Sequence, residues 1–376
     1  MSATFGCVAL LVQLVANLKV PFLRHKRDDD LPPLMAPPSE WLQQLKLDGV
    51  KHDNARNSYL SLLRGVLSGM FFRCDPTTMS ASEYEDCVHV LTDGHAFGRG
   101  LSLHAVTMAG HRRMRSVQEL VQLVARRKVN GSYAETGVWR GGMSISATAA
   151  LQLYGLGHRP VYLCDSFNGV PLPRNTSVRT DETAYRIQWY LHVNELHVQK
   201  MFQKYGVWSP SVHMVKGFYV HSMPPFRAEL QQRGERLAIL RLDGDIYDST
   251  VDVLYNLCDL VEVGGFVVID DFGWGGVGDK HVYGARDATL DFRYVHGIED
   301  DDHVLHRIDD NGAWFRKARH VTLQRERYLH SLDASSKREA TQWLRPAGTP
   351  YPRGAHYLTL RKRWEDLTAN ESVALR

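Results

Sequence analysis

Four aspartates that follow two short apolar segments are the residues best suited to chemistry: Asp243, Asp245, Asp270 and Asp271. The segments before them, residues 237–240 (LAIL) and 265–269 (GFVVI), have the composition of buried parallel strands. Neighbouring strands lie about 5 Å apart, so we expect the four carboxylates to crowd the carboxyl edge of one sheet, where open α/β sheets bind ligands. Crowded carboxylates ionise together at low cost only when a cation lies among them. The acids therefore predict a site for a hard divalent ion such as Mg²⁺, with turn and helix capping as the alternative.

A glycine-containing turn, residues 135–142 (ETGVWRGG), follows a predicted strand through Tyr133 and Ala134 and precedes a predicted helix. Glycines let a backbone approach a ligand closely, and the start of a helix offers free N–H groups. The spacing matches neither the dinucleotide motif GxGxxG nor the phosphate-binding loop GxxxxGK[ST]. Glu135 distinguishes this turn from an ordinary one, because an acid at the strand end can accept a hydrogen bond or pair with a cationic ligand.

Asp165 ends the next predicted strand, residues 160–165 (PVYLCD). In nucleoside-binding α/β domains an acid at this position accepts hydrogen bonds from the ribose hydroxyls. An aspartate after a strand can also cap a turn. With the glycine turn preceding it, we favour the ribose-binding interpretation.

Strands and helices alternate over residues 129–318, which predicts a doubly wound, Rossmann-like α/β sheet. Residues 249–264 are expected to form one crossover helix between the two acid-tipped strands. Late, partly antiparallel strands are expected at residues 291–296, 303–309 and 312–317. Three flanking regions complete the predicted organisation: an extension and Pro-rich linker (1–40), a mostly helical cap or lid (41–128) and a basic C-terminal extension (319–376).

Composition argues for an ordinary globular protein. The chain has 376 residues, 44% hydrophobic and 23% charged, and its net charge of +3 gives no reason to expect a nucleic-acid partner. The five cysteines lack metal-ligand spacing, and two of them, Cys164 and Cys258, fall in the predicted core. We therefore expect reduced, packed thiols with neither a disulfide framework nor a zinc site.

The N-terminal segment FGCVALLVQLVANLKVPFL is apolar, but polar residues interrupt it and no basic region precedes it. A mobile or amphipathic extension is the favoured interpretation, and a signal or membrane anchor is the alternative. The cytoplasm is accordingly the favoured compartment, and a membrane partner is not expected.

Taken together, ETGVWRGG, DSFNGVPLP, LRLDGDIYDST, FVVIDDF and the late FRYVHGI and RIDDNGAWFRK motifs resemble the macrocin O-methyltransferase family. The resemblance extends from about Tyr59 to Lys317. It implies a class I methyltransferase fold that binds S-adenosylmethionine (SAM) over the carboxyl edge of the sheet. The members of this family are Mg²⁺-dependent enzymes that methylate sugar hydroxyls of macrolide and aminocoumarin natural products.

The resemblance also implies roles for individual residues. SAM would be bound by Thr107, Met108, Glu135, Thr136, Gly137, Val138, Trp139, Asp165 and Ser166, the last two at the ribose. Mg²⁺ would be held by Asp243, Asp270 and Asp271, and Asp245 would be the general base. This chain is longer than the members of the family, and the additional tail can change the shape of the acceptor pocket. The resemblance therefore supports the type of reaction more strongly than the class of acceptor.

The expected reaction is the transfer of the SAM methyl group to a hydroxyl of a small molecule that contains a sugar or polyol. A sugar hydroxyl is a poor nucleophile at neutral pH, so a metal ion and a base would both assist it. The alternatives are a catechol or phenol O-methyltransferase with the same metal chemistry, and a catalytically inactive SAM-binding interaction domain. Self-association into a homo-oligomer is compatible with each of these.

Overall fold

The computed structural model describes residues 49–74, 77–83, 85, 87, 104–174, 191–273, 284–298 and 302–345. The predicted N-terminal extension and the last part of the C-terminal extension lie outside this part of the chain. Among the described helices, none combines the length and the apolar composition needed to cross a bilayer.

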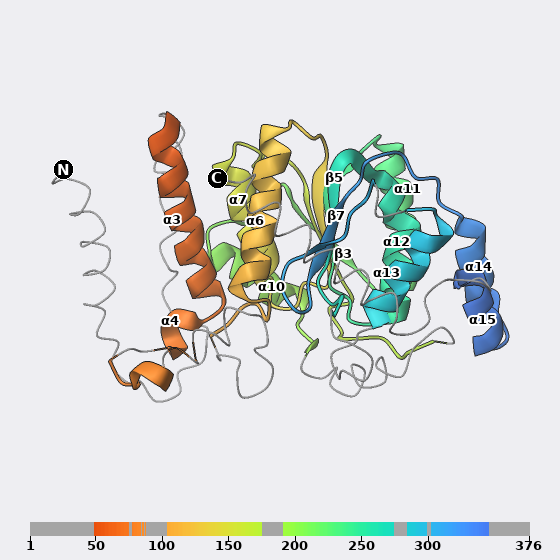
Figure 1. Cartoon of the computed structure of the whole chain (residues 1–376), viewed down its shortest axis with the longest axis horizontal. Coiled ribbons are helices and arrows are strands. Elements are labelled where there is room, and N and C mark those ends of the chain that lie inside the picture. The colour runs from red at the N-terminus through yellow and green to blue at the C-terminus, as the bar shows by residue number, and fades with distance from the viewer. Residues whose placement is uncertain are drawn as a thin grey trace.

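A twisted sheet of seven strands forms the centre of the described structure (Figure 1). Its strands are β1 (Ser132–Thr136), β2 (Val161–Asp165), β3 (Val212–Lys216), β4 (Leu237–Leu242), β5 (Val261–Ile269), β6 (His306–Arg307) and β7 (Ala313–Arg316). Their order across the sheet is β3-β2-β1-β4-β5-β7-β6. The first five strands are parallel, while β7 pairs with β5 and β6 with β7 in antiparallel fashion. The predicted doubly wound sheet with late antiparallel strands is therefore confirmed.

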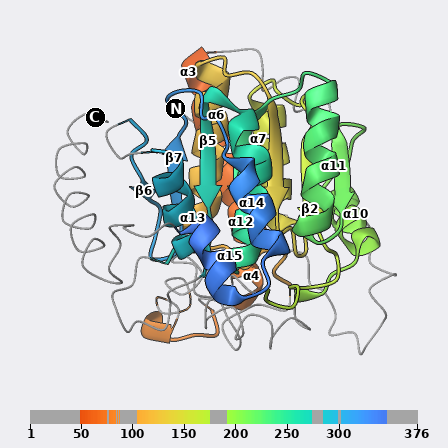
Figure 2. The ribbon, with the colours of Figure 1, turned by 90° about the vertical axis from the view of Figure 1, so that its right-hand side faces the viewer.

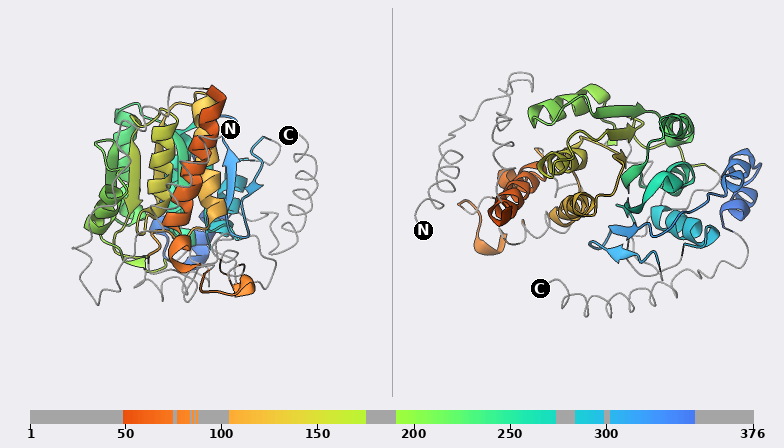
Figure 3. Two further views of the ribbon diagram at one scale, coloured as in Figure 1. Left: turned by 90° about the vertical axis from the view of Figure 1, so that its left-hand side faces the viewer. Right: turned by 90° about the horizontal axis from the view of Figure 1, so that it is seen from above.

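Helices cover both faces of this sheet (Figures 1 and 3). The described helices are α3 (Gly49–Leu67), α4 (Met70–Arg73), α6 (His111–Arg126), α7 (Gly142–Leu153), α10 (Glu195–Lys204), α11 (Tyr219–Gln232), α12 (Tyr247–Leu257), α13 (Gly284–Val295), α14 (Arg325–Asp333) and α15 (Lys337–Leu344). One apolar core joins α3, α6, α7 and α10 to the sheet, and the other joins α11, α12 and α13 to its opposite face. The consecutive residues Ile239 and Leu240 of β4 enter different cores, because successive side chains of a strand point to opposite faces of the sheet.

The crossover helix between the acid-tipped strands is shorter than the sequence predicted. Helix α12 ends at Leu257, a single 3₁₀ turn follows at Cys258–Leu260, and β5 begins at Val261. The buried ammonium of Lys317 donates to the carbonyls of Cys258, Asp259 and Val261 at 3.2, 2.8 and 2.6 Å. These carbonyls are thus bound by a residue far along the chain. The prediction of a longer helix was wrong because it relied on the apolar spacing of residues 249–264 alone.

The strand predicted at residues 291–296 is wrong, because this segment belongs to α13. Its short alternation of polar and apolar residues conceals a helical spacing that appears only over a longer window: Ala285, Ala288 and Phe292 are all buried. The polar Asp291 is tolerated inside because it accepts a hydrogen bond from Tyr247 at 2.8 Å.

The expectation of reduced cysteines is also wrong in part. Cys74 and Cys87 form a disulfide, whereas Cys164 and Cys258 are free and buried, as predicted. The paired cysteines are 13 residues apart in sequence, a spacing that no short motif marks. Only the course of the chain after α4 brings them within bonding distance.

Peptide mapping without reductant should therefore recover a fragment that links Cys74 to Cys87, and replacement of both by Ser should lower the free energy of unfolding by about 2–4 kcal/mol. In the native protein, Cys164 and Cys258 should resist alkylation, because burial raises the pKa of each thiol. Recovery of both Cys74 and Cys87 as freely alkylated thiols would contradict the bridge.

Candidate active site

The sheet register brings the predicted site residues to one edge. Thr136 pairs with Cys164 on one side and with Leu242 on the other, and Leu242 pairs with Ile269. The residues at the next position therefore lie at the same level: Asp165, which ends β2, and Gly137, Asp243 and Asp270, which directly follow β1, β4 and β5. This edge includes the point between β1 and β4 where the strand order reverses, which is where doubly wound sheets bind ligands.

Asp243, Asp270 and Asp271 form one carboxylate cluster, which we call the acid cluster. One oxygen from each lies within 4.8 Å of the others. Asp270 and Asp271 are buried, and the side chain of Asp243 is 30% exposed towards the pocket. The arrangement predicted from the two strand ends is thus present.

The environment divides these three acids electrostatically. Burial raises the pKa of the Asp271 carboxyl well above its usual range, and the repulsion of Asp243, Asp245 and Asp270 adds to this effect. Burial also acts on Asp270, but Arg113 and Arg241 outweigh it and lower its pKa. For Asp243 burial dominates over Arg241, and its pKa is raised. The protein's own cations therefore neutralise only part of the cluster's charge.

The residues present fit a divalent cation. Three carboxylates at this spacing offer the oxygen donors that Mg²⁺ prefers, and Mg²⁺ typically uses few protein carboxylates and keeps several waters. Oδ2 of Asp271 is buried and has no hydrogen-bond partner among the described residues. A buried, unpartnered carboxylate oxygen is costly unless a ligand completes its environment.

Asp245 lies on the same turn as Asp243 and has an unusual backbone. Its φ of 57° is in the left-handed region, which Asp and Asn tolerate better than most side chains. The turn is closed by the N–H of Ile246, which donates to the carbonyl of Gly244 at 2.6 Å. Asp245 lines the same pocket as the acid cluster.

Gly137 allows the ends of β1 and β4 to meet. Its φ is 89°, and a Cβ at this position would lie 1.6 Å from the carbonyl oxygen of Asp243. No side chain fits there, so the glycine turn and the acid cluster can be neighbours only because residue 137 is Gly.

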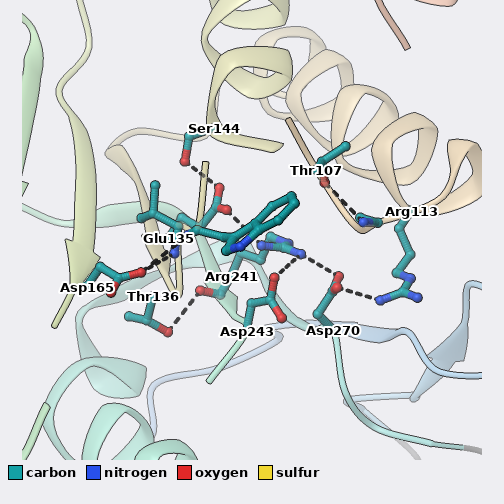
Figure 4. A network of polar contacts seen from close by, with 12 residues as sticks. Thr107, Arg113, Glu135, Thr136, Ser144, Asp165, Arg241, Asp243 and Asp270 are labelled. Carbon is teal, nitrogen blue, oxygen red and sulfur yellow. Dashed lines mark hydrogen bonds and ion pairs between the residues drawn. The ribbon is translucent and has the colours of Figure 1, made fainter. Parts of the chain in front are cut away.

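Glu135 is 1% exposed, and both of its carboxylate oxygens contact protein donors (Figure 4). Oε1 accepts from Arg241 at 2.8 Å, and Oε2 accepts from Tyr133 at 2.6 Å and Ser144 at 2.5 Å. Burial raises its pKa to about 7 despite these partners. The structure thus shows Glu135 as a buried acid that joins β1, α7 and β4 at the pocket wall, and its predicted contact with SAM stays a prediction.

Asp165 binds the glycine turn directly. Oδ2 accepts from the N–H groups of Val138 and Trp139 at 2.7 and 3.4 Å, and Oδ1 accepts from the N–H of Phe167 at 2.7 Å. The capping role that the sequence offered as the alternative is therefore present. A carboxylate oxygen has more than one acceptor site, so ribose binding stays a prediction beside this structural role.

The segment that carries Thr107 and Met108 is held against the start of α7. The N–H of Gly142 donates to the carbonyl of Val106 at 2.8 Å, and a Cβ on Gly142 would lie 2.4 Å from that oxygen. Arg140 donates to the carbonyl of Ala105 at 2.8 Å. These contacts bring a segment from outside the sheet to the pocket wall.

One pocket collects almost every residue that the sequence assigned to SAM, metal or catalysis. Its lining includes Thr107, Met108, Glu135, Gly137, Val138, Trp139, Asp165, Ser166, Asp243, Asp245, Asp270 and Asp271. Thr136 is not in the lining, because its hydroxyl points back into the sheet and donates to the carbonyl of Arg241 at 3.3 Å.

Sequence reasoning missed the two cations beneath the acid cluster, Arg113 and Arg241. Arg241 is 1% exposed and contacts Glu135, Asp243 and Asp270 at 2.8, 2.7 and 2.8 Å. Arg113 contacts Asp270 at 2.6 Å and Asp309 at 3.0 Å. A signal for Arg241 existed, since a charged residue in the apolar strand LAILRL needs a buried partner. Arg113, on an amphipathic helix far away in sequence, offered none.

Arg241→Met should lower the free energy of unfolding by about 3–5 kcal/mol, because it leaves buried carboxylates without their shared cation. Denaturant unfolding measures this change. Arg115→Ala is the matched control: it removes an exposed pair with Glu119 and should cost about 0.5 kcal/mol or less. Equal stability of Arg241→Met and the unaltered protein would disprove this role.

The strand order, the glycine turn and the pocket over the carboxyl edge define a class I SAM-dependent methyltransferase fold, and comparison with known proteins agrees. A sequence model of the family described as macrocin-O-methyltransferase (TylF) matches residues 56–317. The solved structure of the O-methyltransferase NovP is 30% identical with a TM-score of 0.58, covering 70% of this chain and 100% of that one.

Two relatives with assigned activities are also similar. The 8-demethyl-8-(2,3-dimethoxy-alpha-L-rhamnosyl)-tetracenomycin-C 4'-O-methyltransferase of Streptomyces olivaceus is 33% identical over 70% of this chain and 94% of its own length. The mycinamicin III 3''-O-methyltransferase of Micromonospora griseorubida is 32% identical over 64% of this chain and 93% of its own. The chain belongs to the macrocin O-methyltransferase family, and it is an O-methyltransferase.

Proposed function

We propose that this enzyme transfers the methyl group of SAM to a hydroxyl of a small molecule that contains a sugar or polyol, with a divalent cation held by the acid cluster. The observation that carries the proposal is the placement of the acid cluster and the glycine turn in one pocket. The close approach of Gly137 to the Asp243 carbonyl makes the glycine turn and the acid cluster immediate neighbours.

The acceptor class is inferred from the relatives. The Streptomyces olivaceus enzyme is named for a rhamnosyl-bearing tetracenomycin, and the Micromonospora griseorubida enzyme for mycinamicin III. Both matches cover more than nine-tenths of the relative's length.

The chemical step would be an in-line displacement. The acceptor oxygen attacks the methyl carbon, the carbon–sulfur bond breaks, and the products are a methyl ether and S-adenosylhomocysteine (SAH). Asp245 would accept the hydroxyl proton, since it lines the pocket on the turn that also carries Asp243. A cation bound at the acid cluster would supply Lewis acidity that lowers the pKa of the hydroxyl.

The chain's other residues position the reactants. The backbone of the glycine turn, held by Asp165, would form the wall against the methyl donor. Trp139, which has a φ of 46° and the Arg140 guanidinium 4.4 Å from its ring centroid, lines the same pocket. Such preorganisation is a large term in a reaction that requires three collinear atoms.

Asp245→Asn should lower kcat by about 10²–10⁴-fold, because it removes the base while Asn tolerates the same left-handed backbone. SAH and Mn²⁺ affinities, measured by calorimetry, should stay unchanged. Asp310→Asn alters an exposed acid outside the pocket lining and should leave the rate unaltered. A fully active Asp245→Asn enzyme would disprove the assignment of the base.

Asp271→Asn tests the metal separately. It should weaken Mn²⁺ binding by about tenfold or more, since even changes outside the ligand shell cost 10–100-fold. Without metal, this variant should melt at a higher temperature than the unaltered protein, because the crowded carboxylate that Asn replaces opposes burial. A given Mg²⁺ concentration should raise the melting temperature of the unaltered protein more than that of the variant.

Chelation by EDTA should abolish turnover on a panel of polyol and catechol acceptors, and Mg²⁺ should restore it. The panel also separates a sugar methyltransferase from a phenol methyltransferase. Full activity in EDTA, together with metal-independent melting, would remove the metal from the proposal.

A further inference from the structure

The C-terminal helices α14 and α15 lie beyond the residues that match the family, and they pack on the outer side of α12 and α13 (Figure 2). Tyr328 of α14 is fully buried, and its ring stacks on Tyr255 of α12 with centroids 5.6 Å apart. Arg345, directly after α15, forms a second anchor by pairing with Asp291 of α13 at 2.8 Å. The C-terminal extension, to which the sequence assigned no chemistry, thus includes a docked helical hairpin.

The hydroxyl of Tyr328 contacts a buried carboxylate of α12. It donates to Oδ1 of Asp252 at 2.8 Å. The same carboxylate accepts from both Nη atoms of Arg174, at 2.9 and 2.7 Å. Asp252 is 4% exposed and the Arg174 side chain is 31% exposed, so only the acid is removed from water, while the bidentate contact defines the geometry of the pair.

Arg174 ends a segment that forms part of the pocket wall. Residues 169–171 of this segment, Gly169, Val170 and Pro171, line the pocket. The backbone N–H of Arg174 donates to Oδ2 of Asp248 at 2.6 Å, and Asp248 precedes Ser249, another lining residue. We call residues 169–174 the rim. Its last residue is held by two acids one turn apart on α12.

Electrostatics makes this attachment hard to release. Burial raises the pKa of both Asp248 and Asp252, and Arg174 opposes the shift in each case. Movement of Arg174 away from α12 would leave two adjacent buried carboxylates without their cation, which is strongly unfavourable. Tyr328 adds a donor from behind and orients the Asp252 carboxylate towards Arg174.

We propose that the C-terminal hairpin positions the rim of the methyl-transfer pocket through the Tyr328–Asp252–Arg174 relay. The three side chains are positioning residues, and none of them touches a reactant. The inference rests on the proposed function in that the pocket is where donor and acceptor bind. A segment outside the family match would then set the shape of the pocket wall in this enzyme.

The first experiment compares Tyr328→Phe with Arg345→Gln in the full chain. Both remove a hairpin anchor, but only Tyr328 is linked to Arg174. Tyr328→Phe should accelerate amide hydrogen exchange in the rim, at residues 169, 170, 172 and 174, by about three- to tenfold, the loss expected for one intramolecular hydrogen bond of ordinary strength. It should also weaken SAH binding, or raise KM for whichever panel acceptor is turned over, with little change in kcat. Arg345→Gln should lower the melting temperature and leave rim exchange, SAH affinity and KM unaltered.

Arg174→Met supplies the second arm, and Arg174→Lys tests conservative rescue. Arg174→Met should reproduce the effects of Tyr328→Phe more strongly, and the double variant should resemble Arg174→Met alone, because one relay is broken twice. Arg174→Lys should restore part of the SAH affinity and part of the exchange protection.

Unchanged rim exchange in both Tyr328→Phe and Arg174→Met would overturn the proposal, and so would an equal effect of Arg345→Gln. Exchange and melting need no turnover, so they test the relay even if the unaltered protein fails to bind SAH. That failure would count against the proposed function alone.

Discussion

The guanidinium of Arg241 is the constraint on which the site depends. It lies inside the sheet at 1% exposure and touches an acid from each of three neighbouring strand ends: Glu135, Asp243 and Asp270. Without an internal cation, so many carboxylates could not share one buried edge. Since each of the three comes from a different strand, the ion pairs also hold the carboxyl ends of β1, β4 and β5 together, and with them the two halves of the pocket.

This internal neutralisation is incomplete, and the proposed cation site depends on the charge that remains. Asp270 is paired with Arg113 and Arg241 and keeps a low pKa, whereas burial and the repulsion of three acids outweigh Arg113 at Asp271 and raise its pKa. A cluster that was fully paired would have no reason to bind a cation. A cluster with no arginine would oppose folding before any cation arrived. The observed arrangement lies between these limits and is compatible with a site that folds before it binds the proposed cation.

A second set of buried acids paired with an arginine lies on α12, outside the acid cluster. Asp248 and Asp252 on α12 are buried, and Arg174 from the pocket rim contacts both. Here the acids hold a segment of chain in place, and the C-terminal hairpin supports them from outside through Tyr328. The family's shared unit and the additional helices of this chain are thereby joined through charge and hydrogen bonding as well as through apolar packing.

The sequence by itself determined the doubly wound sheet, the two acid-tipped strands and the glycine turn, because each depends on short patterns of apolar, acidic and Gly residues. Tertiary structure alone decided where the compensating groups came from. Arg113, Lys317 and Tyr328 contact partners that are distant in sequence, Cys74 pairs with Cys87 across 13 residues, and no local spacing encodes such pairings. The errors at residues 258–264 and 291–296 also arise from contacts that a short window of sequence does not contain. Lys317 binds carbonyls in the segment that follows α12, and packing along the twelve residues of α13 favours a helix over a strand. The local pattern of residues predicts which acids follow each strand, but only the folded chain determines which cations pair with them.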